Sequence, residues 1–163
     1  MPESTIPYTK RDGIIILSDA GAVHTYTVAF EPGDLAITVP GTATTRILDR
    51  GSLENVVLRK GDDAPCELSF SAYLRNVQGA DFATLLDIAH RYDGGYVETN
   101  WVSTSDTDVF TVDVSVIYSG AAFGAADEEL LFGKCEIRAN VSEGDPNTVN
   151  VTITSNVTKP TVV

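Results

Sequence analysis

The sequence predicts a mainly β fold of the α+β class, with two packed antiparallel sheets in a β-sandwich or barrel-like arrangement and one helix at residues 81–92. Most apolar residues alternate with polar ones, clusters of Gly, Asp and Pro separate the alternating runs, and a single segment has helical spacing. Successive side chains of a strand point to opposite faces, so alternation indicates one buried and one polar face. One-sided burial favours antiparallel pairing over a parallel sheet that is covered on both faces.

The strands are expected where this alternation is found. They lie at residues 13–18, 25–30, 35–39, 67–75, 109–118, 134–141 and 149–154. Gly, Asp and Pro in residues 60–65 and 143–147 predict turns beside these strands. Gly adopts positive φ, Asp bonds to its own backbone, and Pro cannot continue a central strand.

The helix at residues 81–92 is predicted from a different spacing. Its apolar residues recur at i, i+3, i+4 and i+7, which places them on one helical face. They are Phe82, Leu85, Leu86 and Ala89. Asp81 is positioned to cap the start, and two glycines at residues 94–95 follow the end.

Length and charge restrict the class of protein. The chain has 163 residues, with 11 basic and 23 acidic side chains that give a formal charge of −12. This length predicts a single domain over residues 1–163. The N-terminus has no secretory signal and no apolar run could span a bilayer, so we expect a soluble protein without a membrane partner. The acidic balance argues against affinity for nucleic acid through neutralised phosphates.

A long loop or hairpin is expected at residues 41–64, whose first half fits neither strand nor helix spacing. Long loops in compact domains are usually functional or disordered. Charges of both signs and a few large apolar residues predict contacts between subunits or between rings of subunits; a mobile surface loop is the alternative. The candidate contact residues are Arg46, Asp49, Arg50 and Glu54.

No catalytic or cofactor-binding motif is present in the sequence. There is no Gly-x-Ser-x-Gly turn, and the two histidines, His24 and His90, are expected at the surface or its boundary. Cys66 and Cys135 fall on the inward positions of their strands and are expected to be inert. Metal-ligand spacing is also missing. We therefore expect no enzyme, no cofactor and no metal.

Three stretches together resemble a known family. They are residues 66–75 leading into the predicted helix, residues 100–105 (Asn-Trp-Val-Ser-Thr-Ser) before the strand at 109–118, and residues 142–148 (Ser-Glu-Gly-Asp-Pro-Asn-Thr) before the last strand. In this order they resemble the major tail tube proteins of long-tailed bacteriophages, over about residues 33–155. Tube subunits of contractile injection systems and of type VI secretion share this fold and stay open as alternatives.

The resemblance implies a structural role in a virion. Family members form homo-hexameric rings that stack into a hollow tail tube, assembled around a tape-measure protein and bounded by tail terminator and tail tip proteins. Double-stranded DNA passes through the tube during ejection. The resemblance thus implies a phage tail protein made in the host cytoplasm, without catalysis.

A shared barrel implies a wall that faces the DNA. Polar positions on two strands are the candidates for this lumen, and they are Glu67, Ser69, Ser71, Thr111, Asp113 and Ser115. Six copies at −12 give −72 formal charges per ring, which disfavours adhesion of DNA to the wall. The alternative for these residues is that they face another layer or the solvent.

A second class of function also stays open. A monomeric β-sandwich binding module, for example for carbohydrate, would have the same strand pattern. Such a module normally exposes a cluster of aromatic side chains, whereas this chain has one Trp, at position 101, and six scattered Tyr. This count favours the tube subunit over the binding module.

Overall fold

The computed structural model describes residues 8–9, 12–29, 35–105, 108–121 and 124–163. It is mainly β with two antiparallel sheets and two short helices, which confirms the predicted class. The elements are β1 (Gly13–Ser18), β2 (Thr25–Thr27), β3 (Ala36–Thr38), β4 (Thr44–Asp49), β5 (Ser52–Lys60), β6 (Cys66–Tyr73), α1 (Leu85–His90), α2 (Tyr96–Asn100), β7 (Val112–Tyr118), β8 (Glu128–Ser142), β9 (Thr148–Ser155) and β10 (Thr161–Val162). No helix among these described residues is long and apolar enough to cross a membrane.

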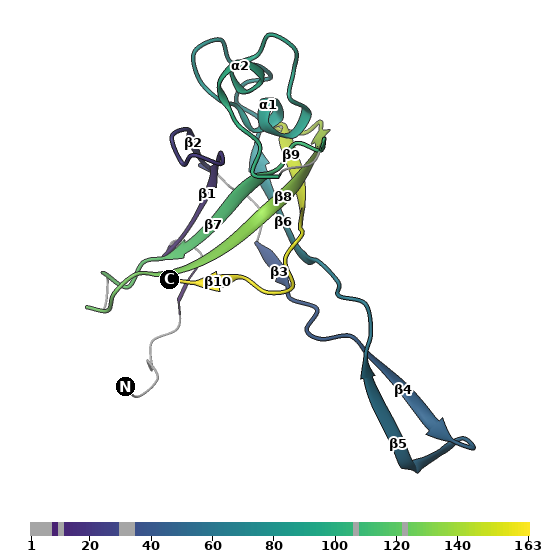
Figure 1. The fold of residues 1–163 in the computed structure, drawn as a ribbon. Coiled ribbons are helices and arrows are strands. Elements are labelled where there is room, and N and C mark those ends of the chain that lie inside the picture. The colour runs from purple at the N-terminus through teal and green to yellow at the C-terminus, as the bar shows by residue number, and fades with distance from the viewer. Residues whose placement is uncertain (1–7, 10–11, 30–34, 106–107, 122–123) are drawn as a thin grey trace.

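The main sheet has eight strands in the order β2-β1-β7-β8-β9-β6-β3, and β10 pairs with β8 outside this path. The long strand β8 connects its two halves, because residues 128–135 pair with β7 and residues 135–142 pair with β9. The β7–β8 register shifts between Val112 and Val114, and Lys134 has a positive φ of 52°. Such an irregularity bends a strand and increases its twist. The sheet therefore curves around its own core (Figure 1).

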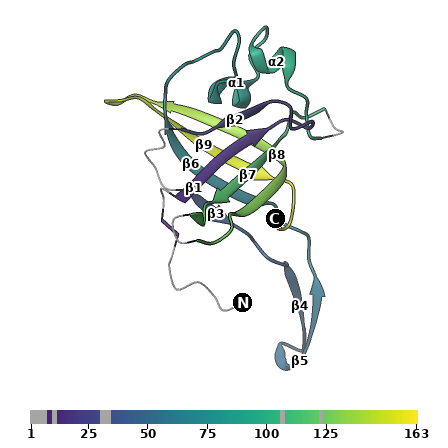
Figure 2. The same cartoon turned by 90° about the vertical axis from the view of Figure 1, so that its left-hand side faces the viewer.

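The core lies on the inner face of this curved sheet. Leu68 and Phe70 on β6, Val151 on β9 and Phe132 on β8 are all buried, while the residues between them face outward. Helix α1 packs against β8, and the two helices close one end of the sheet (Figure 2).

The helical region differs from its prediction in two ways. Helix α1 is shorter than residues 81–92, because Thr84 rather than Asp81 is the N-cap and its Oγ1 accepts a hydrogen bond from the Asp87 N–H at 3.1 Å. Arg91 ends the helix in the left-handed region, at φ 48°. Phe82 precedes the helix and is 51% exposed, so it does not belong to the buried face. Helix α2 had no counterpart in the sequence prediction.

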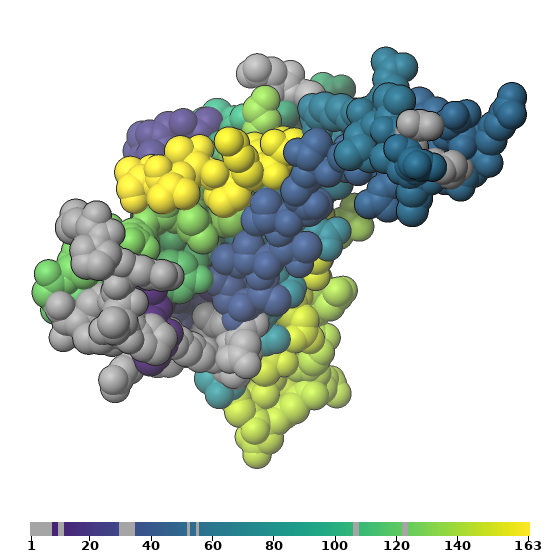
Figure 3. Space-filling model, turned by 90° about the horizontal axis from the view of Figure 1, so that it is seen from below, coloured from purple at the N-terminus to yellow at the C-terminus, as the bar shows by residue number. Residues whose placement is uncertain are grey.

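The second sheet is the hairpin β4–β5, and it does not pack on the first as predicted. The sequence predicted two packed antiparallel sheets in a β-sandwich or barrel-like arrangement; both sheets are present, but the eight-stranded sheet covers its core alone and the hairpin projects away from it (Figures 1 and 3). All residues of β4 are exposed. Arg50 and Gly51 form its tip with φ of 48° and 80°.

Candidate functional site

The two faces of the projecting hairpin follow from its register. Ile47 lies opposite Val57, and Arg46 lies opposite Leu58. Residues directly opposite each other in an antiparallel pair share a face, and alternate residues along one strand do so as well. The register shifts between Ile47 and Asp49, so this alternation does not extend from Val57 to Leu53 near the tip. We call the exposed apolar residues Ile47, Leu53 and Val57 together the apolar stripe of the hairpin.

Six large apolar side chains of the hairpin are exposed. Leu53 is 69% exposed, Leu58 60% and Val57 55%. Ile47, Leu48 and Val56 are exposed too. An isolated two-stranded hairpin is at best marginally stable in water, and contiguous exposed apolar surface on a soluble protein marks an interaction site. The hairpin thus has the composition of a contact surface.

The hairpin also differs from the rest of the chain in charge. Residues 44–60 contain four basic and two acidic side chains, a formal charge of +2 within a chain of −12. One ion pair lies at its base, where Lys60 Nζ is 2.9 Å from Asp63 Oδ2, and it is too exposed to stabilise the hairpin much. The hairpin is therefore a basic projection on an acidic body.

The four predicted contact residues all lie on this projection. Arg46 is in β4 and Asp49 at its end, Arg50 is in the turn, and Glu54 is in β5. All four are exposed. The sequence analysis counted the large apolar residues of this segment as a reason to expect contacts, but it named only charged residues as candidates. Val57, which lies opposite Ile47, was not singled out.

A second feature is the polar outer face of the main sheet. Strands β6, β9 and β8 align Glu67 with Thr154 and Glu136, and one step further Ser69 with Thr152 and Arg138. Beyond this row, hydrogen bonds link polar side chains of the three strands. Ser71 Oγ donates to Asn150 Oδ1 at 2.8 Å, and Asn150 Nδ2 donates to Ser142 Oγ at 2.8 Å. Polar side chains, both short ones and the longer Glu67, Glu136 and Arg138, thus form a surface across three strands.

Five of the six predicted wall residues lie on the outward side of the sheet. Glu67 and Ser69 on β6 are exposed, and Ser71 beside them is half-buried. Asp113 and Ser115 are half-buried on the outward positions of β7. Burial raises the pKa of the Asp113 carboxyl, although the Lys134 N–H donates to its Oδ1 at 3.3 Å.

Thr111, the sixth predicted wall residue, is not on the exposed face. It is 3% exposed, and its N–H donates to Ser103 Oγ at 3.1 Å. Its hydroxyl lies 2.9 Å from that of Thr104. Residues 103–105 therefore cover Thr111, and the alternation that placed it on the outward face did not take this loop into account.

The thiols and imidazoles show no arrangement for catalysis. Cys66 and Cys135 both lie beside Ser155, one on each neighbouring strand, so roughly 9–10 Å separates their backbones and a disulfide needs less than ~7 Å. Burial raises the pKa of Cys135 to about 12. His24 Nδ1 is 3.3 Å from the Tyr96 hydroxyl, whereas His90 is exposed and stacks on Tyr92. In the described part of the chain, no three His, Cys, Asp or Glu residues are grouped to hold a metal.

Comparison with known proteins finds similarity only in structure. No family model and no curated protein sequence matches the chain. Solved structures do match over nearly the whole length of both chains. One is a chain of the PVC sheath/tube terminator of an extracellular contractile injection system in the extended state, with TM-score 0.56, 11% identity, and coverage of 99% of this chain and 98% of that one.

Two further matches come from the anti-feeding prophage. A chain of its tube terminating cap has TM-score 0.56 and 10% identity and covers 100% of this chain and 95% of its own length. A chain of its sixfold-symmetrised baseplate has TM-score 0.56 and 8% identity, with 100% and 97% covered. At these identities the likeness establishes a shared fold, one found in the structural parts of phage-like injection particles.

Proposed function

We propose that the protein is a structural subunit of the tube of a phage-like tail or contractile injection particle, in which six copies form a ring and the rings stack. The observation that carries this proposal is the hairpin β4–β5, which exposes apolar residues on a basic projection away from the body. A fold shared end to end with chains of tube and baseplate structures supports it.

The main sheet offers a way to close a ring. It ends at β2 on one side and at β3 on the other, and both are strands of only three residues. An open strand edge is a template for pairing with another chain, and closure into a barrel removes it. We assign these two edges to contacts between neighbours within a ring, and the hairpin to contacts between rings.

The polar outer face then becomes the lining of the bore. Glu67, Ser69, Ser71, Asp113 and Ser115 are the retained candidates, and double-stranded DNA is the proposed cargo. Short neutral side chains leave the bore open, and carboxylates repel phosphates within about one Debye length, ~8 Å at physiological salt. A tape-measure protein inside the tube and terminator and tip proteins at its ends complete the proposed set of partners, in a particle assembled in the host cytoplasm.

The burial of Trp101 weakens the case for a binding module. Platforms for sugars use exposed aromatic rings, and Trp101, the only Trp of the chain, is 3% exposed. No catalytic arrangement among the described residues favours an enzyme either. The tube subunit is the function that the geometry supports best.

Electron microscopy of the purified protein over a range of concentrations tests the proposal. Rings of six, and stacks of rings at higher concentration, are expected. A species that stays monomeric at the highest concentrations would refute it. Replacing Glu67 by Lys separately tests the lining, since rings should still form while particles eject their DNA more slowly.

A further inference from the structure

We propose that a hollow beneath the helices at the opposite end of the molecule receives the β4–β5 hairpin of a second copy. This inference rests on the proposed function, since it assumes that copies stack. We call the described residues 76–105 and 108–111, which include α1 and α2, the cap. Figures 1 and 2 show the cap at one end of the main sheet and the hairpin beyond the other.

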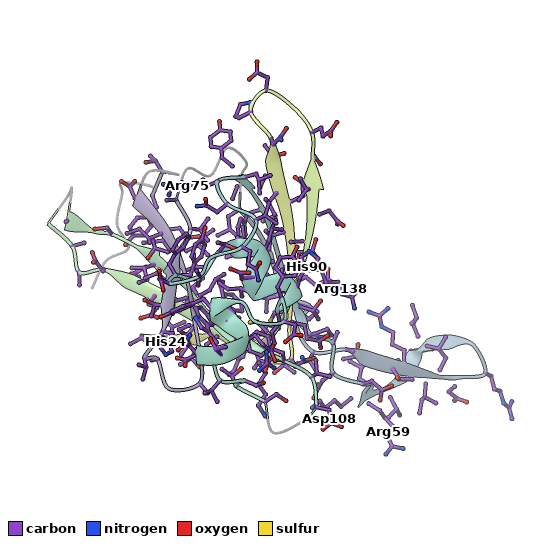
Figure 4. The ribbon with its side chains drawn as sticks, turned by 90° about the horizontal axis from the view of Figure 1, so that it is seen from above. His24, Arg59, Arg75, His90, Asp108 and Arg138 are labelled. Carbon is purple, nitrogen blue, oxygen red and sulfur yellow. The ribbon has the colours of Figure 1, made fainter. Side chains whose placement is uncertain are left out.

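The hollow lies between β2 and the segment that leads into α1. It has two adjoining parts of about 290 and 400 Å³, and both are lined by Tyr26, Phe82 and Ala83. Arg75 lines the first part and His24 the second. Figure 4 shows these two residues well away from the projecting hairpin. A hairpin can therefore reach the hollow only from another molecule.

Apolar side chains in and around the hollow are exposed and are not part of the hydrophobic core. Phe82 is 51% exposed and Val23, in the wall of the hollow, is 76% exposed. Val77 is 57% exposed, and its carbonyl accepts a hydrogen bond at 3.2 Å from the Oγ1 of Thr84, which lines the first part of the hollow. Covering these residues with the apolar stripe of a hairpin would remove both exposed surfaces from water.

The charges of the two ends are complementary. The cap contains five acidic residues and one basic residue, and together with Arg75, which lines the hollow, it has a formal charge of −3, whereas the hairpin carries +2. Arg91, the one basic residue, is already held by Glu98, with its Nε 3.0 Å from Oε2. Complementary charge speeds encounter and disfavours the wrong pairing, such as hairpin on hairpin. A second copy of this chain is therefore the occupant that fits.

This contact would join two different surfaces of the same protein. Such a heterologous contact does not close on itself in pairs and propagates along an axis when copies stack. The contact thus explains why one end bears a projection and the other end bears a hollow.

Disulfide trapping tests the inference. Leu53→Cys and Phe82→Cys are made in separate chains, which are mixed, allowed to assemble and oxidised. Val162→Cys replaces Phe82→Cys in the matched control, because Val162 is 71% exposed and lies on β10 rather than on the cap. The native thiols are buried, so the wild-type protein should give no cross-link.

We expect a mixed Leu53→Cys/Phe82→Cys dimer at least tenfold more abundant than the dimer with Val162→Cys, and its loss when Arg46 and Arg59 are reversed to Glu. Val77→Cys provides a second position on the cap in case Phe82→Cys misfolds. Rings that stack without either cap cross-link would overturn the proposed receptor and leave the proposed function standing. Absence of any assembly would overturn both.

Discussion

The main sheet and the β4–β5 hairpin are both antiparallel β structure, but they differ in what stabilises them. In β6 buried and outward positions alternate, and its inner residues pack into one core. In β4 every residue is exposed, and its strong pairing is with β5 alone. The sheet thus has within one chain the burial that folding requires, whereas the hairpin has apolar residues whose burial needs another molecule. This difference supports the proposal that the hairpin makes contacts between copies, whereas the body has a core of its own.

The largest effect on stability is expected in the body. Replacing the fully buried Phe132 by Ala should lower the free energy of unfolding by about 3–5 kcal/mol, because it removes transfer energy and leaves a cavity. Urea unfolding of the monomer measures this change. A loss below ~1 kcal/mol would mean that the core of the curved sheet does not dominate its stability.

An intermediate effect is expected in the cap. Thr84→Ala removes the oxygen that accepts the Asp87 N–H and should cost about 1 kcal/mol. Thermal unfolding gives the value, with Thr84→Ser as the control that keeps the hydroxyl. Equal losses in both variants would show that the side-chain methyl, and not the N-cap bond, stabilises α1.

Substitutions in the hairpin should change assembly rather than the stability of the monomer. Reversing Arg46 and Arg50 to Glu should change monomer stability by less than ~0.5 kcal/mol, as is usual at exposed positions, yet raise the concentration needed for assembly severalfold. Light scattering and urea unfolding report the two quantities. Reversing Lys159, an exposed basic residue outside the hairpin, is the matched control. Normal assembly of the double variant would remove these residues from the interface.

The smallest effect concerns pH and Asp113. Its pKa is raised in the folded state by burial, so the folded protein holds this proton more tightly than the unfolded chain does. The stabilising contribution is complete below the unfolded pKa and is lost as pH rises through the folded one. Asp113→Asn should therefore be at least as stable as the wild type at neutral pH. The free energy of unfolding of the variant, relative to that of the wild type, should then decrease as the pH falls. A constant difference across this range would contradict the assignment.

The same comparison explains what the sequence could predict. Strands β6, β7 and β9 were found because each has one buried face, which gives alternation. Strand β4 was missed because a ribbon exposed on both faces needs no alternation. Strand β8 was expected from residue 134 but begins at Glu128, since residues 129–131 are all half-buried and show no period of two.

Sequence patterns could indicate the hairpin region of the candidate site but not the hollow, because the hollow depends on tertiary structure. Residue composition alone singled out residues 41–64 as a surface for contacts. The hollow at the cap depends on β2 and the segment before α1 lying together, residues far apart in the sequence, and no local pattern indicates it. Thr111 illustrates the same limit, because only the folded chain shows that residues 103–105 cover it.

Sedimentation velocity of the full chain, beside a variant in which a short Gly-Ser link replaces residues 44–60, tests most directly whether the hairpin serves assembly. The wild type should form rings and longer stacks as concentration rises. The variant should fold with unchanged cooperativity and stop at single rings. Stacks of equal length from both proteins, or a wild type that sediments only as a monomer, would contradict the account.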